Sequence, residues 1–266
     1  MTKMEIGELE KAKKILENPS LAIKVANFIG RPVELVIENI NSKMLQKATG
    51  KALEKSLKVA IFSLNKREKL KSSNNKHKVI TAFSGGIGGA FGLSALAIEL
   101  PISTTIMLRS IADIAQAEGH NLDEIETRMA CLEVFSLGSN RSPIDDGAES
   151  AYFSARGAIS YEMKLAIDAV ANMSEKAIQE ALIKGQLPLF VKVIESIASR
   201  FGITVSEKLV AQTIPLIGAV SGASINLMFM NHFQSMAEGH FIVKRLEKKY
   251  GQEMIENKYN HLKIRE

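Results

Sequence analysis

The stretch VITAFSGGIGGAFGLSALAI, residues Val79 to Ile98, holds no charged residue over twenty positions and is followed by Glu99-Leu-Pro101. A second uncharged stretch, Leu209 to Asn231, runs for twenty-three residues. A helix of about 20 such residues is long enough to cross a bilayer. Both stretches carry glycines four residues apart, a spacing that lets two helix backbones approach closely. We therefore expect two long apolar helices that pack on one another. The glycines expected at this contact are Gly85, Gly89, Gly92, Gly218 and Gly222.

Two placements of these stretches are open. Glycines at this spacing serve close helix packing inside a soluble bundle as well as in lipid, and Gln212 and Asn226 make the second stretch only moderately apolar. The stretches therefore form either a buried hairpin of a soluble protein or a segment that enters a bilayer at some stage. An amphitropic protein, which buries the hairpin in solution and exposes it at a membrane, would satisfy both readings.

The pattern of apolar residues predicts an all-α multi-helix bundle without a sheet. Leu53, Leu57, Ile61 and Leu64 recur at helical spacing. No stretch alternates with period two over the length of a strand, and no Asn-Gly hairpin signal occurs. We expect one helix to end near Gly50 and the next to cover Lys51 to Lys71.

Capping residues and prolines give further expected boundaries. Asp146 and Glu149 form a capping box for a helix that starts near Gly147, and Ser174 caps the helix after it. Proline either starts a helix or bends it. Pro101 is therefore expected to start or kink its helix, and Pro215 to kink a later one.

Basic residues are concentrated in one part of the chain. The protein has 34 Lys and Arg against 29 Asp and Glu, a net charge of +5. Between Asn41 and Lys78 there are eleven basic and two acidic residues, a local charge of +9, which leaves −4 for the remainder. Such a block favours an anionic surface as partner. Lys51, Lys55 and Lys58 share one face of the expected helix, followed by Lys66 and Arg67.

A polybasic segment beside an apolar helix is typical of contact with anionic lipid headgroups, and basic residues favour the cytoplasmic side. The alternative is a helix face that is merely solvated. We do not expect nucleic-acid binding, because the chain has no Trp and four Tyr, and no aromatic residues are interleaved with the basic ones. The N-terminal sequence lacks the apolar region of a secretory signal. The single cysteine, Cys131, excludes an internal disulfide and fits a reducing compartment as a packed core thiol.

Motifs with known chemistry are not found in the sequence. HExxH, CxxC and phosphate-loop patterns do not occur. His232 and His240 lie about 12 Å apart along a continuous helix, so they cannot share one ion, and we expect neither a metal nor a cofactor. Polar residues that flank the apolar helices are the remaining candidates, either for a hydrolase-like site or for structural ion pairs. The weak catalytic candidates are Glu99, Arg109, Asp113 and His240, and we expect Arg109 to be buried and paired with Glu99 or Asp113.

Several motifs together resemble the EcsC protein family from about Ala22 to Gly251. They are Gly85-Gly-x-Gly-Gly89, Glu99-Leu-Pro101, Leu108-Arg-Ser-Ile-Ala112, Cys131-Leu-Glu-Val-Phe135, Tyr152-Phe153, Ser199-Arg-Phe-Gly202, Ser206-Glu-Lys208, Pro215-x-x-Gly-Ala219, Asn226, His232-Phe233, Gly239-His-Phe241 and Arg245-Leu-Glu247. The resemblance implies an all-α bacterial protein of the cytoplasm or the cytoplasmic membrane, associated with a membrane transport or secretion system. It implies no established reaction. We expect a charged N-terminal helix in residues 1–21, the family domain in 22–251 and a tail in 252–266.

Overall fold

The computed structural model describes residues 1–17, 42–64, 92–137, 150–213 and 222–262, and every regular element within these ranges is a helix. The predicted all-α class is therefore confirmed for the described part of the chain. The helices are α1 (Lys3–Leu16), α4 (Ser42–Ser63), α6 (Gly92–Ala117), α7 (Ile125–Glu133), the 3-10 helix η1 (Val134–Ser136), α8 (Ala151–Asp168), α9 (Glu175–Ile183), α10 (Pro188–Thr213), α11 (Gly222–Tyr250) and α12 (Gln252–His261).

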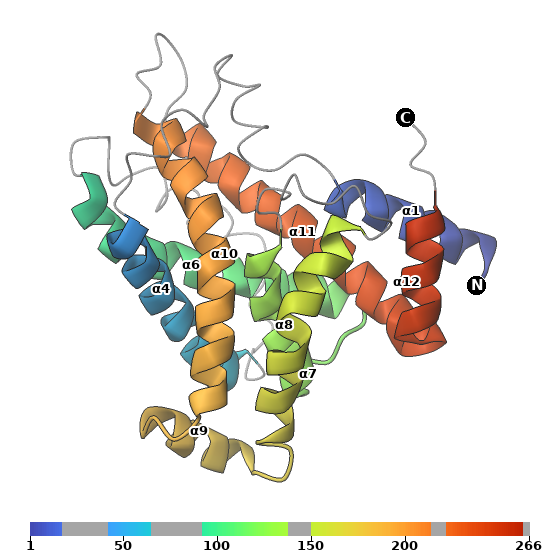
Figure 1. Ribbon diagram of the computed structural model, residues 1–266, viewed down its shortest axis with the longest axis horizontal. Coiled ribbons are helices and arrows are strands. Elements are labelled where there is room, and N and C mark those ends of the chain that lie inside the picture. Colours follow the sequence, from blue (N-terminus) through green and yellow to red (C-terminus); the bar gives the residue numbers. More distant parts are fainter. Residues whose placement is uncertain (18–41, 65–91, 138–149, 214–221, 263–266) are drawn as a thin grey trace.

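The body of the molecule is formed by the four longest helices of the described residues, α4, α6, α10 and α11 (Figure 1). α4 packs against α6 and α10, and α11 packs against α6 and α10. The short α7 and η1 lie among them and contact α4, α6, α8, α10 and α11 between them. α8 covers α10, while α1 and α12 pack against α11 away from α4 (Figure 1).

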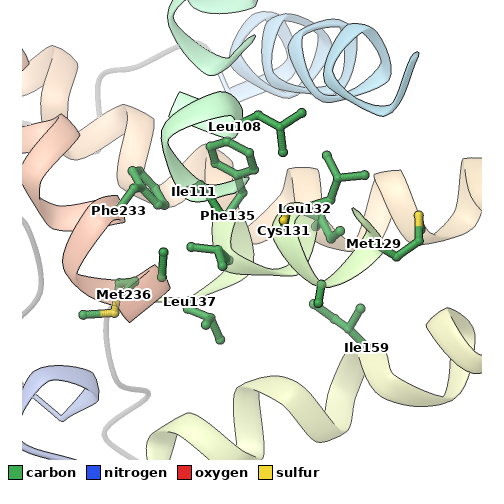
Figure 2. Close-up of a cluster of buried hydrophobic side chains, with 14 of the residues drawn as sticks. Leu108, Ile111, Met129, Cys131, Leu132, Phe135, Leu137, Ile159, Phe233 and Met236 are labelled. Carbon is green, nitrogen blue, oxygen red and sulfur yellow. The ribbon is translucent and has the colours of Figure 1, made fainter. Parts of the chain in front are cut away.

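The core is centred on α7 and η1, in which every residue from Thr127 to Ser136 is buried. Phe135 is edge-on to Phe201 with 5.1 Å between ring centroids, and it lies 5.4 Å from Phe233. Such aromatic pairs add about 0.5–1.5 kcal/mol beyond the burial of their surface. Figure 2 shows Phe135 and Phe233 together with Leu108 and Ile111 from α6. Cys131 is fully buried in this core, as expected.

Several helices run without a break through glycines, among them α4 and α10. α4 continues through Gly50, so the helix boundary predicted there is wrong, and α10 continues through Gly202. A glycine inside a helix costs about 0.5–1 kcal/mol relative to alanine. Burying Leu53 and Leu57, which follow Gly50 on α4, contributes more than this cost. Tertiary burial therefore overrides the local preference of Gly50 for a helix end.

The caps confirm one predicted helix start and correct another. Ser174 accepts a hydrogen bond from the Ala177 backbone N–H at 3.3 Å and caps α9, as predicted. α8 begins at Ala151 and not near Gly147, because Ser150 accepts from the Phe153 N–H at 3.2 Å and is its N-cap. Pro101 lies inside α6, which starts at Gly92.

Several predictions fall outside the described residues. They include the mutual packing of Val79–Ile98 and Leu209–Asn231, and the positions Gly85, Gly89 and Gly218. Gly92 and Gly222 are the first residues of α6 and α11. Within the described ranges, no helix combines the length and the apolar character that crossing a membrane requires. Residues 252–266, expected to be a tail, contain helix α12.

Candidate functional site

A row of lysines follows the outer side of α4. Lys47, Lys51, Lys55 and Lys58 are all exposed, and their spacing of four, four and three residues keeps them on one side of the helix. We call these four residues the lysine face. Glu54, the one acidic residue of the described part of α4, lies 3.7 Å from Lys58, with both side chains more than half exposed. An exposed pair of this kind contributes little, so the lysine face stays strongly positive.

The opposite side of α4 is committed to the protein core. Ala52, Leu53 and Ala60 are fully buried, and Leu57 and Ile61 are almost fully buried. This amphipathic division follows from the helical spacing of apolar residues that the sequence showed. Since the apolar side is covered by α6 and α10, the side of α4 that a partner could contact is the one that carries the lysine face. Lys66 and Arg67, which were expected to extend the basic surface, lie outside the described residues.

A second group of polar residues is buried where α7, α8 and α11 meet. Arg156 of α8 donates two parallel hydrogen bonds to Glu247 of α11, from Nη1 to Oε1 at 2.7 Å and from Nη2 to Oε2 at 3.0 Å. Its Nε lies 3.8 Å from Oε1 of Glu133, the last residue of α7. Their side chains are no more than a tenth exposed. A bidentate arginine pair is strong and directional, and here it holds the three helices in register.

His240 and Tyr152 extend this group. The Tyr152 hydroxyl lies 2.9 Å from Nδ1 of His240, and Nε2 of His240 lies 3.4 Å from Oε2 of Glu133, too long for a good hydrogen bond. Burial lowers the pKa of His240 well below its usual value, with Lys244 and Arg156 adding to the effect. Burial also raises the pKa of Tyr152, which stays a phenol. The neutral imidazole therefore accepts from Tyr152 at Nδ1 and turns its Nε2–H toward Glu133. We call Glu133, Tyr152, Arg156, His240 and Glu247 the buried network.

The order carboxylate, imidazole, hydroxyl is that of a general-base relay. In this protein the hydroxyl at its end is a phenol that is 3 % exposed, and His240 is fully buried. A relay acts only on a group within hydrogen-bond reach of its terminal oxygen, and burial of that oxygen denies a substrate such reach. In this conformation the arrangement joins α7, α8 and α11, and its terminal hydroxyl is buried.

The structure places the polar residues that were expected to form a cluster at different depths. Arg109 is half-buried and not fully buried, and Asp113 is exposed. Of the three weak catalytic candidates whose side chains are described, only His240 is fully buried, and it lies beside Glu133 and Tyr152. Glu99 belongs to α6, but its side chain lies outside the described residues. Asp113 is exposed because it lies on the side of α6 that faces away from the core, where Met107 and Ile111 are buried.

The sequence analysis named His240 as a candidate but did not single out Arg156 and Glu247. The sequence did contain Tyr152-Phe153 and Arg245-Leu-Glu247 among the motifs of the family resemblance. Nothing in the sequence indicated that these two motifs lie next to each other in the fold. Among the described residues, no three His, Cys, Asp or Glu side chains are grouped as a metal site would require. Glu238, two residues before His240 on α11, contacts Lys11 of α1 at the surface.

Comparison with known proteins identifies one match. The model of a family described as the EcsC protein family matches residues 3–246. This range includes α1, which the sequence resemblance had left outside. No curated protein and no solved structure matches the chain.

Proposed function

The chain belongs to the EcsC protein family, and on this premise we propose that it is a peripheral helical protein that binds the anionic surface of the cytoplasmic membrane and works with a membrane transport or secretion system. The observation that supports this proposal is the lysine face of α4. Four exposed lysines lie on one side of a helix whose other side is buried, so the charge is held on a rigid surface.

The magnitude of the expected attraction is sufficient for reversible binding. A lysine near an anionic membrane contributes about 1 kcal/mol, so four contribute roughly 4 kcal/mol, or about a thousandfold in affinity. Because the contact is electrostatic, salt weakens it: the Debye length falls from about 10 Å at 0.1 M to about 3 Å at 1 M. The apolar side of α4 takes no part, since it packs against α6 and α10.

Vesicle sedimentation tests the proposal. The protein is expected to sediment with phosphatidylserine-containing vesicles at low salt, and to stay in the supernatant with phosphatidylcholine vesicles or at about 1 M salt. The variant Lys51→Glu, Lys55→Glu and Lys58→Glu should bind at least about a hundredfold more weakly, because three favourable contacts of about 1 kcal/mol each become repulsive.

A matched control carries the same charge change elsewhere. Lys3, Lys14 and Lys258 are exposed on α1 and α12, far from α4 in Figure 1. Reversing these three to glutamate should leave binding within about threefold of the wild type, because only the lysine face meets the lipid. Equal loss in both variants would show that net charge alone governs binding. Sedimentation with native membranes but not with lipid vesicles would replace lipid by a membrane protein as the partner.

A further inference from the structure

The outer side of α4 presents charge and no apolar side chain. Among the α4 residues whose side chains the structure describes, the exposed ones are Gln46, Lys47, Lys51, Glu54, Lys55 and Lys58. Val59 and Phe62 are partly buried and pack against the core. A helix that sinks into the headgroup layer does so with an apolar side, and α4 has turned its apolar side inward. The contact of α4 with an anionic surface is therefore expected to depend on charge alone.

Glu54 lies in the middle of the lysine face. It follows Lys51 by three residues and precedes Lys58 by four, so it is the neighbour of both on the helix surface. Its Oε1 lies 3.7 Å from Nζ of Lys58, and the two side chains are 62 % and 52 % exposed. An exposed ion pair of this kind contributes little, so the carboxylate and the ammonium both stay available to an approaching surface. The lysine face and Glu54 together carry four positive charges and one negative charge, a net +3.

The length of the lysine face favours one way of meeting a flat surface. Lys47 and Lys58 are eleven residues apart, which is about 16 Å along a helix. At 0.1 M salt the Debye length is about 10 Å, so a surface that met one end of α4 would leave the lysine at the other end screened. All four lysines act together when the axis of α4 lies parallel to the surface. In this orientation Glu54 faces the headgroups with them.

We infer that α4 lies flat on the bilayer and that Glu54, which then faces the headgroups, restricts binding to surfaces rich in anionic lipid. This inference rests on the proposed function and adds a residue that sets its specificity. The attraction grows with the charge of the face and with the negative potential of the surface, so one carboxylate raises the anionic content that binding requires. A lysine ammonium is a point charge without the planar fork of arginine, so the face responds to charge density and not to headgroup shape.

Removing the charge of Glu54 tests the inference. Glutamine has a size and a helix propensity similar to those of glutamate, so Glu54→Gln keeps α4 and changes only the charge. This variant should bind phosphatidylserine vesicles about fivefold more tightly than the wild type, and should sediment at a lower phosphatidylserine content. The control Glu10→Gln makes the same charge change at an exposed position of α1, which packs against α11 away from α4 (Figure 1). It should bind like the wild type.

Single lysine variants test the flat orientation. They are made in the Glu54→Gln background, where the ion pair with Lys58 is absent. Lys47→Gln and Lys58→Gln should each weaken binding about fivefold, because both ends of the lysine face meet the lipid. A loss at one end without a loss at the other would overturn the flat orientation. Exchanging phosphatidylserine for phosphatidylglycerol at equal molar content should change each affinity by less than about twofold.

The outcomes distinguish the inference from the function on which it rests. If the wild type sediments with phosphatidylserine vesicles and Glu54→Gln binds no more tightly, the role of Glu54 is overturned while the lysine face remains the contact. Equal tightening in Glu54→Gln and Glu10→Gln would also overturn it, because net charge would then explain the effect. Failure of both the wild type and Glu54→Gln to sediment with these vesicles would reject the proposed function and the inference together.

Discussion

At Gly239 the helix α1 lies so close to α11 that no side chain fits between them. A β-carbon placed there would lie 2.7 Å from Cγ of Leu16 and 3.3 Å from the carbonyl oxygen of Ala12. The first contact is shorter than β-carbon contacts in folded proteins, and the second involves backbone that cannot rotate away. The identity of this single residue therefore sets how closely the N-terminal helix can approach.

Gly239→Ala is expected to lower the free energy of unfolding by about 1–3 kcal/mol through overpacking against Leu16. Gly157 of α8 is the matched control, because it is exposed and helical and a β-carbon there meets nothing within 4 Å. Gly157→Ala should stabilise the protein by about 0.5–1 kcal/mol. Urea unfolding of both variants measures the two effects. Equal behaviour of the two would contradict the close approach.

At the scale of elements, the buried network joins α7, α8 and α11 through residues far apart in the chain. Arg156 and Glu247 are 91 residues apart, and Tyr152 and His240 are 88 apart. Removing one member of a buried ion pair leaves a charge without compensation, which typically costs about 3–5 kcal/mol. The network therefore depends on all three helices being packed, and each helix depends on the network for its register.

The network makes stability depend on pH through His240. Burial lowers the pKa of His240 below about 6.5, the usual value of a histidine in an unfolded chain. The unfolded chain therefore binds a proton that the folded one does not. This contribution to stability is complete above about pH 6.5 and declines as pH falls below it, by at most about 1.4 kcal/mol per pH unit. Between pH 7 and about 5.5, the free energy of unfolding should therefore fall by roughly 1 kcal/mol less in His240→Gln than in the wild type.

Urea titrations at the two pH values measure this difference, and His261→Gln is the control because His261 is exposed on α12. His120 is also part of the acid response, because burial lowers its pKa as well, so the His240 variant keeps some pH dependence. An identical loss in His240→Gln and the wild type would show that the imidazole is not held neutral by the fold.

At the scale of the whole molecule, the two ends of the chain are fastened to each other. The Lys13 ammonium of α1 donates to the carbonyls of Tyr259, Asn260 and Leu262 at the end of α12, at 2.7, 3.2 and 2.8 Å. A cation at a helix C-terminus satisfies free carbonyls and complements the helix dipole. The Tyr259 hydroxyl donates to Glu17 and adds a second contact between α12 and α1. The two helices lie side by side in Figure 1.

Lys13→Met is expected to loosen α12 without unfolding the remainder. Three carbonyls lose a charged donor, and a hydrogen bond to a charged group contributes about 1.5–3 kcal/mol. Amide hydrogen exchange in residues 252–261 should therefore speed up by about tenfold or more, while exchange in α7 stays unchanged. The adjacent and exposed Lys14 offers the control, since Lys14→Met should leave the exchange of α12 as it is. Protection of α12 retained in Lys13→Met would disprove this role.

The sequence by itself determined the features that depend on local spacing. Helical periodicity identified the all-α class and the two sides of α4, and a serine before Glu175 identified the cap of α9. Helical spacing within one element is enough for such features, because a 3.6-residue period decides which side chains share a face. Cys131 in the core follows from the same reasoning.

Only the tertiary structure decided which elements meet. Arg109 was predicted to be buried but is half-buried, whereas Arg156, which the sequence did not single out, is buried and paired with Glu247 on another helix. Gly50 continues a helix that its own preference would end. The physical reason is that burying apolar surface between helices contributes more free energy than the helix propensity of one residue, which is about 1 kcal/mol. This burial depends on how the helices pack together, so no single segment of the sequence reveals it.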